Sequence, residues 1–351
     1  MTSSVSLEMP PRTTGFGLLT LDSQFLYRAK YPPKSTNLNG QTGIITGAST
    51  GIGLESCHQF LGLGLSRLIL AVRSQKKGDD TAAALRKAFP KARVDVWILE
   101  MESYKSVQAF AARVDAELPR IDITILNAGM LSNDFELSKE TGHERVVQVN
   151  YLSTFLLTIL LLPILKAKAK ANGTSPARLT VVGSGAALAS KHGWQDQRPL
   201  LPAFDDLNRI PWNFGERYWS SKLLGQLFFT KLYACVDPDD VILNLVDPGL
   251  VKNTSLQRGP SESSLLLAVA IYVVTNIAGR SVKSGASSYV DAAVMKGKES
   301  HGCFIMDWEL RPFAKFIYSP KGKDCAEVLW KETMAELKFA GVEDILANLK
   351  K

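Results

Sequence analysis

Tyr218 and Lys222 are the clearest candidates for acid–base chemistry in this chain of 351 residues. Their spacing of four places a phenol and an ammonium on one face of a helix, so both can point into the same cleft. A tyrosine ordinarily has a pKa near 10, and lowering it by about three units corresponds to roughly 4 kcal/mol of differential stabilisation. Tyr218 is therefore a candidate proton donor, with Lys222 expected to lower its pKa.

Ser184 and Asn150 are polar residues in settings that suit the same chemistry. Ser184 follows a strand-like run at 179–182, and an open parallel sheet presents its ligands at the carboxyl edge of such strands. Asn150 lies among apolar residues of an expected helix, where a buried amide needs hydrogen-bond partners. Hydride transfer to a carbonyl carbon leaves an oxyanion, which needs a proton donor and dipoles that stabilise the charge.

Each of these residues also has an ordinary structural interpretation. A Tyr-xxx-Lys pair is common on helix surfaces, a serine after a strand is often a turn residue or cap, and an asparagine in a helix can face solvent. The order of the residues along the chain favours the catalytic interpretation more than any one of them does.

A glycine-rich turn near the start of the chain predicts a nucleotide site. The sequence TGASTGIG at 46–53 directly follows the apolar run 43–45. Its glycines allow a strand to turn sharply into a helix and let backbone N–H groups approach a pyrophosphate at the helix N-terminus. Many tight turns of this kind bind nothing, so the turn alone is weak evidence. The residues expected to contact the cofactor are Gly47, Ser49, Thr50, Gly51, Ile52 and Gly53.

The order of these motifs resembles the short-chain dehydrogenase/reductase superfamily over residues 38 to 300. The resemblance rests on TGASTGIG at 46–53, Asn127-Ala128-Gly129, Asn150, Ser184, Tyr218 with Lys222, and Asp247-Pro248-Gly249. Within the superfamily the chain is most similar to the retinol-dehydrogenase-like branch. Its long segment before Tyr218 is similar to that of fungal members that serve in secondary metabolism.

The resemblance implies a nicotinamide cofactor and a role for each matching residue. Asn150, Ser184, Tyr218 and Lys222 would be catalytic, with Lys222 also bonding the nicotinamide ribose and Asn150 holding a water on a proton path to solvent. Glu100 stands where the family usually has Asp, which contacts adenine. Further cofactor contacts are expected from Met101, Asn127, Ala128, Gly129, Pro248, Gly249, Val251 and Thr254. Asn253-Thr254 replaces a single threonine, so which side chain would bond the cofactor stays open.

The residues after the second expected strand favour NADP(H) over NAD(H). An acidic residue there would bind the ribose hydroxyls of NAD, whereas this chain has Arg73, followed by Lys76 and Lys77. A cation at this position would attract a 2′-phosphate. The alternative is that these are solvated loop charges, which can hold for the two lysines even if Arg73 binds.

The segment between Ser184 and Tyr218 is longer than is usual for the family and is rich in aromatic residues. We expect these to form one wall of an apolar substrate pocket, with residues 265–272 as a second wall, although aromatic residues also serve as simple packing. His192 could orient a substrate hydroxyl or be a loop histidine. The substrate candidates are Ser184, His192, Trp194, Trp212 and Phe214, with Phe204 in the same wall.

Strand-like and helix-like runs alternate from residue 41, which predicts an α/β fold. The expected architecture is a single Rossmann-like, doubly wound parallel sheet in three α/β/α layers, with an extended substrate loop. Expected strands are 43–45, 67–72, 93–99, 121–126, 179–182, 241–246 and 303–306. Expected helices are 52–61, 81–89, 106–116, 144–168, 217–234, 265–278 and 284–295, with Pro163 kinking or dividing the fourth. The expected parts are an N-terminal extension (1–38), the domain itself (39–320) and a C-terminal helical extension (321–351).

Composition excludes several classes of function. A net charge of +7 and a pI of about 9.1 come from scattered Lys and Arg without interleaved aromatics, so no nucleic-acid partner is expected. The four cysteines have no CxxC spacing and the four histidines no ligand spacing, so neither a metal nor a disulfide framework is expected. No signal peptide is evident, which favours a cytoplasmic enzyme.

Two questions of association stay open. Residues 265–278 are apolar but shorter than the roughly 20 residues of a membrane-spanning helix, so we expect no transmembrane span, while a membrane-surface contact remains an option. The resemblance allows a homodimer through the helices around Asn150 and Tyr218, although the termini of this chain could block that contact.

The expected function is NADPH-dependent reduction of a ketone or aldehyde on a hydrophobic, secondary-metabolite substrate, with Tyr218 as proton donor. One alternative is an NADP+-dependent alcohol dehydrogenase of a lipophilic alcohol. The other is a nonoxidative member of the fold that acts as a scaffold or as another type of enzyme.

Overall fold

The computed structural model describes residues 3–12, 15–174, 176–252 and 279–349. Its centre is an eight-stranded sheet of order β3-β2-β1-β4-β5-β6-β7-β8, in which the first seven strands are parallel and β8 is antiparallel to β7. The strands are β1 (Thr42–Thr46), β2 (Arg67–Val72), β3 (Arg93–Ile98), β4 (Ile123–Leu126), β5 (Ala177–Val182), β6 (Val241–Asp247), β7 (Phe304–Met306) and β8 (Glu309–Arg311).

Mostly apolar, fully buried sequences characterise the central strands. Every residue of β1, β4 and β6 is buried, because helices cover both faces of the sheet. Strand order reverses between β1 and β4, which both pair in parallel with their neighbours. That reversal is the switch point at which doubly wound sheets bind ligands, at the carboxyl ends of the strands.

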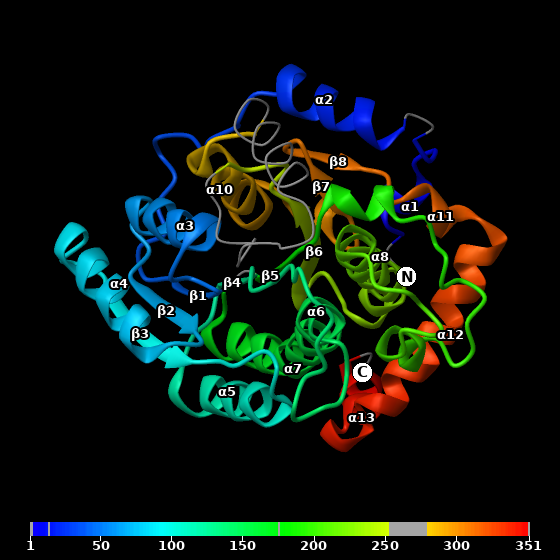
Figure 1. Cartoon of the computed structure of the whole chain (residues 1–351). Helices are drawn as coiled ribbons and strands as arrows, with labels where there is room; N and C mark the ends of the chain where they lie inside the picture. The colour runs from blue at the N-terminus through cyan, green and yellow to red at the C-terminus, as the bar shows by residue number, and fades with distance from the viewer. Residues whose placement is uncertain (1–2, 13–14, 175, 253–278, 350–351) are drawn as a thin grey trace.

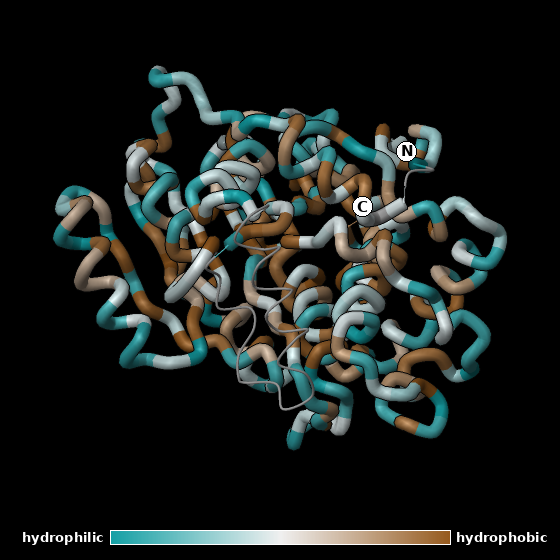
Figure 2. The backbone as a smooth tube through the Cα atoms, turned by 45° about the horizontal axis from the view of Figure 1, so that its top comes forward, coloured by the Kyte–Doolittle hydropathy of each residue, from teal (hydrophilic) through white to brown (hydrophobic). Residues whose placement is uncertain are grey.

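Two helical layers enclose the sheet (Figure 1). One face is covered by α3 (Gly51–Gly62), α4 (Gln75–Ala88) and α10 (Val282–Val290), whose buried residues form one apolar cluster. The other face is covered by α5 (Tyr104–Glu117), α7 (Thr154–Asn172) and α8 (Phe214–Leu232). Figure 2 shows hydrophobic residues concentrated along these central elements. The three-layer α/β/α prediction is confirmed.

Shorter helical segments complete the chain. They are α6 (Arg145–Val147), η1 (Gln148–Ser153), η2 (Gly185–Ala189), η3 (Leu201–Asp205), η4 (Tyr233–Cys235), η5 (Asp291–Met295), η6 (Lys298–Ser300), α11 (Lys315–Tyr318) and η7 (Lys338–Ala340). The C-terminal helices α12 (Pro320–Glu336) and α13 (Val342–Leu349) form an outer layer over α8 and α7 (Figure 1).

The N-terminal segment packs onto the far end of the sheet. It holds α1 (Val5–Glu8) and α2 (Phe16–Leu26). Ser4 Oγ donates to the carbonyl of Gly302 at 2.6 Å, and the Phe304 N–H donates to Ser6 Oγ at 2.9 Å. Of the apolar residues of α2 whose burial is described, Leu19 alone is buried, while Leu18, Phe25 and Leu26 are exposed.

The helix containing Asn150 differs from the expectation at one point. It runs from Arg145 to Asn172 as α6, η1 and α7, and Pro163 lies inside α7 without dividing it. The irregular turn is instead η1, a π-helical segment that contains Asn150. Burial of the surrounding apolar residues compensates for the backbone hydrogen bond that Pro163 cannot make.

This same helix has the length and apolar composition to cross a membrane. However, 83% of its most apolar stretch is buried inside the protein, as expected of a core helix. Residues 253–278, which include the expected helix 265–278 and the expected wall 265–272, lie outside the described residues.

Candidate active site

The glycine-rich turn joins β1 to α3 in a geometry that needs its glycines. Gly47 and Gly51 have left-handed backbones with φ of +64° and +57°. A Cβ on Gly53 would lie 2.5 Å from the Gly47 carbonyl oxygen, so no side chain fits there. The side chain of Thr50, at the N-cap, makes no capping hydrogen bond with the described residues. The first N–H groups of α3 therefore remain available to an anion, as a pyrophosphate requires.

Asn127 and Thr46 lock together the ends of β4 and β1 at the switch point. Asn127 Nδ2 donates to the Thr46 carbonyl at 2.8 Å, and the Ala128 N–H donates to Thr46 Oγ1 at 2.8 Å. The hydroxyl of Tyr289, from α10, donates to Asn127 Oδ1 at 2.9 Å. Asn127 is thus a fixed part of the floor beside the glycine-rich turn.

Arg73 and Glu100 lie side by side at the carboxyl ends of β2 and β3. Arg73 Nε is 3.8 Å from a carboxylate oxygen of Glu100, and the Arg73 side chain is 54% exposed. Its guanidinium is therefore accessible to an incoming anion, which would compete with the Glu100 carboxylate for Arg73. Met101 is buried in the core.

Tyr218, Ser184 and Lys222 meet between α8 and the end of β5. The Ser184 side chain lies close enough to the Tyr218 hydroxyl to oppose the rise in the pKa of Tyr218. Lys222 Nζ lies 5.8 Å from the centroid of the Tyr218 ring and donates to the Val182 carbonyl at 3.1 Å. The structure thus brings three of the four predicted catalytic side chains together.

Asn150 reaches the same place from η1. Its Oδ1 accepts from the Met130 N–H at 2.8 Å, and its Nδ2 donates to the Met130 carbonyl at 2.8 Å and to Ser221 Oγ at 3.0 Å. A Cβ on Gly129 would lie 3.2 Å from Asn150 Oδ1 and 3.7 Å from Lys222 Nζ. Gly129 therefore lets the strand end approach both side chains.

A small cavity lies beneath these residues. Its volume is about 10 Å³, and its lining includes Asn150, Ser221, Lys222 and Gln226. This volume corresponds to about one water molecule. Gln226 is buried; its Oε1 accepts from the Ala314 N–H at 3.0 Å, while its Nε2 has no hydrogen-bond partner among the described residues.

Burial sets the electrostatics of the site. It raises the pKa of Tyr218 to about 12, with the charge of Asp247 adding to the rise and the Ser184 side chain opposing it. Burial also lowers the pKa of Lys222 to about 8, against the attraction of Asp247. The expected lowering of the Tyr218 pKa by Lys222 and a bound nicotinamide concerns the complex with the cofactor and stays a prediction, whereas in the protein alone desolvation of the phenolate sets the pKa.

A buried charged cluster that the sequence analysis missed supports the loop after β6. Arg280 Nη2 donates to Asp307 Oδ1 at 2.6 Å, and Arg280 Nη1 donates to the Pro248 carbonyl at 3.4 Å. Asp307 and Trp308 both have φ of +58°, a strained conformation for residues other than glycine. Arg280 and Asp307 are 27 positions apart and lie in no motif, so no sequence signal pointed to them.

The Asp247-Pro248-Gly249 loop also closes onto Ser184. The Asp247 carboxylate is buried, its Oδ2 lies 3.2 Å from where a Cβ of Gly185 would be, and burial raises its pKa. Gly249 has φ of +76°, and a Cβ there would clash with Arg280 Nη1 at 2.6 Å. Val251 is buried beside this loop, whereas Thr254 lies outside the described residues.

The predicted substrate residues differ in how deeply they are buried. Trp194 is 1% exposed, and its indole N–H donates to Ser220 Oγ at 2.8 Å, so it supports α8 rather than lining an open wall. His192 stacks on Phe316 at 4.1 Å between ring centroids, and burial lowers its pKa. Phe204 is buried, while Trp212 and Phe214 are half-buried.

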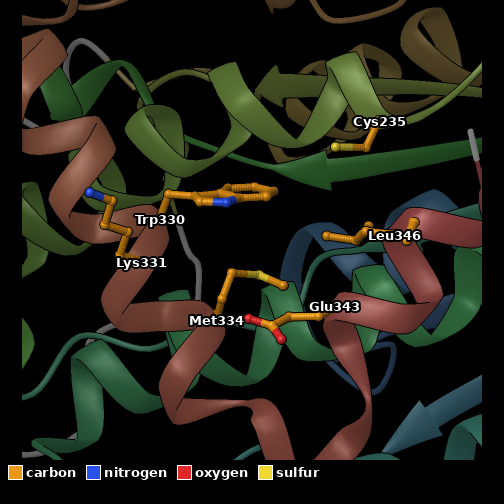
Figure 3. A pocket seen from close by; sticks show the side chains of 7 residues that line it. Cys235, Trp330, Lys331, Met334, Glu343 and Leu346 are labelled. Carbon is orange, nitrogen blue, oxygen red and sulfur yellow. The ribbon is translucent and has the colours of Figure 1, made fainter.

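A larger pocket of about 460 Å³ lies elsewhere, between η4, α12 and α13. Figure 3 shows Trp330, Met334 and Leu346 around it, with Lys331 and Glu343 at its border. None of its lining residues belongs to the site around Tyr218.

The sequence matches known proteins along its whole length. A model of the short chain dehydrogenase family matches residues 41–194. The chain is 46% identical to the short chain dehydrogenase/reductase mfmJ of Annulohypoxylon moriforme, over 98% of both chains. It is 42% identical to the short chain dehydrogenase virL of Hypocrea virens, over 100% of both, and 36% identical to fogG of Aspergillus ruber, over 99% of this chain and 100% of that protein.

Solved structures share the fold at lower sequence identity. L-sorbose reductase from Gluconobacter frateurii, complexed with NADPH and L-sorbose, superposes with a TM-score of 0.57 at 20% identity, over 78% of this chain and 97% of that one. NADPH-bound carbonyl reductase from chicken fatty liver gives a TM-score of 0.57 at 19% identity, over 80% and 96%.

Proposed function

This chain belongs to the short-chain dehydrogenase/reductase family, and on that basis we propose that it reduces a ketone or aldehyde on a hydrophobic substrate of fungal secondary metabolism, using NADPH. Membership makes it an oxidoreductase with a nicotinamide cofactor. The observation that carries the finer proposal is the meeting of Tyr218, Ser184 and Lys222 at the carboxyl edge of the sheet, with Lys222 Nζ 5.8 Å from the centroid of the Tyr218 ring.

The residues at the switch point fit a dinucleotide. The uncapped start of α3 would bind the pyrophosphate, and the absence of a side chain at Gly53 lets the turn pack against the Gly47 carbonyl. The cofactor supplies the hydride when bound. Lys222 would bond its ribose, and the loop at Pro248 and Gly249, held by Arg280, would face its nicotinamide.

Tyr218 would donate its proton to the substrate oxygen as that oxygen gains negative charge. Ser184 would donate a second hydrogen bond to the same oxygen and so stabilise the developing charge. Lys222, when protonated, would stabilise the phenolate that Tyr218 leaves behind. The cavity between Lys222 and Asn150 has room for one water, through which Tyr218 could regain a proton.

The electrostatics are compatible with Tyr218 as a proton donor. With a pKa of about 12 in the protein alone, Tyr218 holds its proton at neutral pH, as a proton donor requires. The complete set of Asn150, Ser184, Tyr218 and Lys222 also argues against a nonoxidative scaffold.

The preference for NADPH rests on Arg73. Its exposed guanidinium at the end of β2 would form charge-assisted hydrogen bonds with a 2′-phosphate. The L-sorbose reductase and carbonyl reductase structures, which share the fold, both contain NADPH.

The proposal is tested by titrating the protein with NADPH and NADH while following quenching of its tryptophans, and then screening hydrophobic ketones and aldehydes for NADPH consumption. We expect tighter binding of NADPH and turnover with carbonyl substrates. Binding of neither nucleotide would overturn the proposal, and turnover confined to alcohols with NADP+ would reverse the assigned direction.

A further inference from the structure

Helix α2 turns its polar side to the protein and its apolar side to solvent. Of its inward residues, Leu19 and Ser23 are buried and Thr20 and Gln24 are half-buried. A surface helix normally buries its apolar stripe and exposes its polar one. The outward side of α2 instead carries Leu18 (64% exposed), Leu21 (50%), Phe25 (63%) and Leu26 (70%), with Asp22 and Gly17 beside them.

The inward side of α2 is fixed by buried polar contacts. Ser23 Oγ donates to Asp307 Oδ1 at 2.5 Å, and Arg280 Nη2 donates to the Ser23 carbonyl at 2.6 Å. Rotating the helix to bury its exposed leucines would break these bonds. The buried pair of Arg280 and Asp307 would then lose its hydrogen bonds to Ser23. The outward position of the apolar side chains therefore follows from how the helix is anchored.

Basic residues follow the exposed apolar side chains. Arg28, Lys30 and Lys34 lie in a stretch, residues 27–36, that contains no acidic residue, and all three are exposed. Lys30 Nζ lies 3.7 Å from a Glu309 oxygen, in a pair that is half-exposed on both sides. Tyr31, between the lysines, is 48% exposed.

We propose that α2 and the segment through Lys34 dock this protein onto the surface of a bilayer that contains anionic lipid. The apolar side chains of α2 enter the boundary between headgroups and acyl chains, and the basic residues bind the anionic headgroups. Tyr31 suits the interfacial layer, where an apolar ring and a polar hydroxyl are both satisfied.

A second copy of the chain fits this surface less well than a bilayer does. Stable protein interfaces use about 20 to 30 residues a side, whereas the exposed apolar residues with described burial number five here, on one short helix and its C-terminal flank. The basic segment that follows would face its own like charges in a symmetric contact. An anionic bilayer satisfies both the apolar and the basic parts.

The location of α2 links docking to the site. The helix contacts η2, which begins directly after Ser184. The side-chain Nε2 of Gln24 lies 3.1 Å from where a Cβ of Gly249 would be. Docking through α2 therefore brings the carboxyl edge of the sheet close to the lipid. Only the use of this arrangement to admit a lipophilic substrate rests on the proposed function, whereas docking itself does not.

Docking is tested by sedimenting the full chain with vesicles of phosphatidylcholine, with and without phosphatidylserine. We expect binding to the mixed vesicles that weakens with salt. The variant L18S/L21S/F25S should lower the bound fraction by about tenfold or more, because the side chains that enter the lipid are lost. R28Q/K30Q should remove the preference for phosphatidylserine.

The matched control is L207S/F339S, which changes two exposed apolar residues away from α2 and should leave binding unchanged. Equal binding by the triple variant, or no binding by the unaltered chain, would overturn the proposal. A dimer in light scattering that the triple variant dissociates would assign the surface to a second copy instead. Thermal unfolding of each variant checks that it folds, and NADPH binding, measured separately, distinguishes failure of docking from failure of the proposed function.

Discussion

At the scale of single residues, burial decides the protonation of the two central groups in opposite directions. Tyr218 is held neutral because its phenolate loses hydration, and Lys222 is brought close to neutrality because its ammonium does. The free protein thus carries a protonated phenol beside a lysine whose charge responds to pH in the physiological range. Sequence order alone identified both residues, but it could not give the sign of the Tyr218 shift, which depends on the depth of the site.

The pH profile of reduction should therefore be set by Lys222. Below pH 8 the ammonium is present and stabilises the phenolate formed on proton transfer, and above pH 8 it is progressively lost, while Tyr218 stays protonated. We expect kcat/KM for reduction to fall as pH rises through about 8. K222R should keep its charge and move that fall to higher pH. A profile that is flat from pH 6 to 10 would contradict this assignment.

Substitutions at Arg73 and at Glu100 should change the affinity for NADPH in opposite directions. R73A should weaken NADPH binding by about 10- to 100-fold and leave NADH binding unchanged, because a charge-assisted contact to the 2′-phosphate is lost. E100Q should tighten NADPH binding, because the carboxylate 3.8 Å from Arg73 Nε no longer competes for it. Fluorescence titration measures both, with K87A as a control on α4. Equal losses for NADPH and NADH in R73A would argue against a phosphate contact.

At the scale of elements, strands were predicted more closely than helices. The strand 67–72 matches β2 to the residue, because its apolar run is uninterrupted. Helix α4 begins at Gln75 rather than 81, since Ser74 caps it in a stretch whose first turn has no apolar residue. The π-helical turn at Asn150 has no local signature, because it follows from the contacts of Asn150 with Met130 and Ser221.

His143 holds three of these elements together. Its Nδ1 is 2.8 Å from Asp205, at the end of η3, and its Nε2 is 3.2 Å from Glu336 of α12. Although burial lowers the pKa of His143, the hydrogen bonds with both carboxylates outweigh it and raise the pKa to about 9. The histidine precedes α6 by two residues and so helps to fix the start of the helix that carries Asn150.

This network predicts a pH-dependent stability. Because the folded pKa lies above the ordinary value of about 6.5, the stabilisation is fully present below pH 6.5 and is lost as pH rises through 9. Urea unfolding at pH 6 and pH 10 should show a loss of up to roughly 3 kcal/mol that is absent in H143Q. The same pH dependence in H143Q would assign the effect to other groups.

At the scale of the whole molecule, the described N-terminal segment is built into the domain. Ser4 and Ser6 bond residues 302 and 304, and Ser23 joins the pair formed by Arg280 and Asp307. Such contacts join residues hundreds of positions apart and involve no motif, so the sequence predicted the extensions but not their attachment. The family motifs, by contrast, sufficed to predict the switch point and the residues around Tyr218.

The packing of the C-terminal helices indicates whether the protein forms a dimer in solution. Since α12 and α13 pack over α8 and α7, the face through which the resemblance allowed a dimer is covered in this chain. We expect a monomer in solution, with a mass of about 38.4 kDa by light scattering in the absence of lipid. A stable dimer at micromolar concentration would contradict this expectation.

The central claim is that Tyr218 gives its proton to the substrate oxygen, and the Tyr218→Phe variant tests it most directly. With the best carbonyl substrate found by screening, we predict that NADPH turnover falls by about 10²- to 10⁴-fold while NADPH binding, measured by tryptophan quenching, stays within about twofold of the unaltered protein. The exposed Tyr31→Phe should change neither. Turnover that survives in Tyr218→Phe, with Tyr31→Phe equally active, would contradict the assignment of Tyr218 as proton donor.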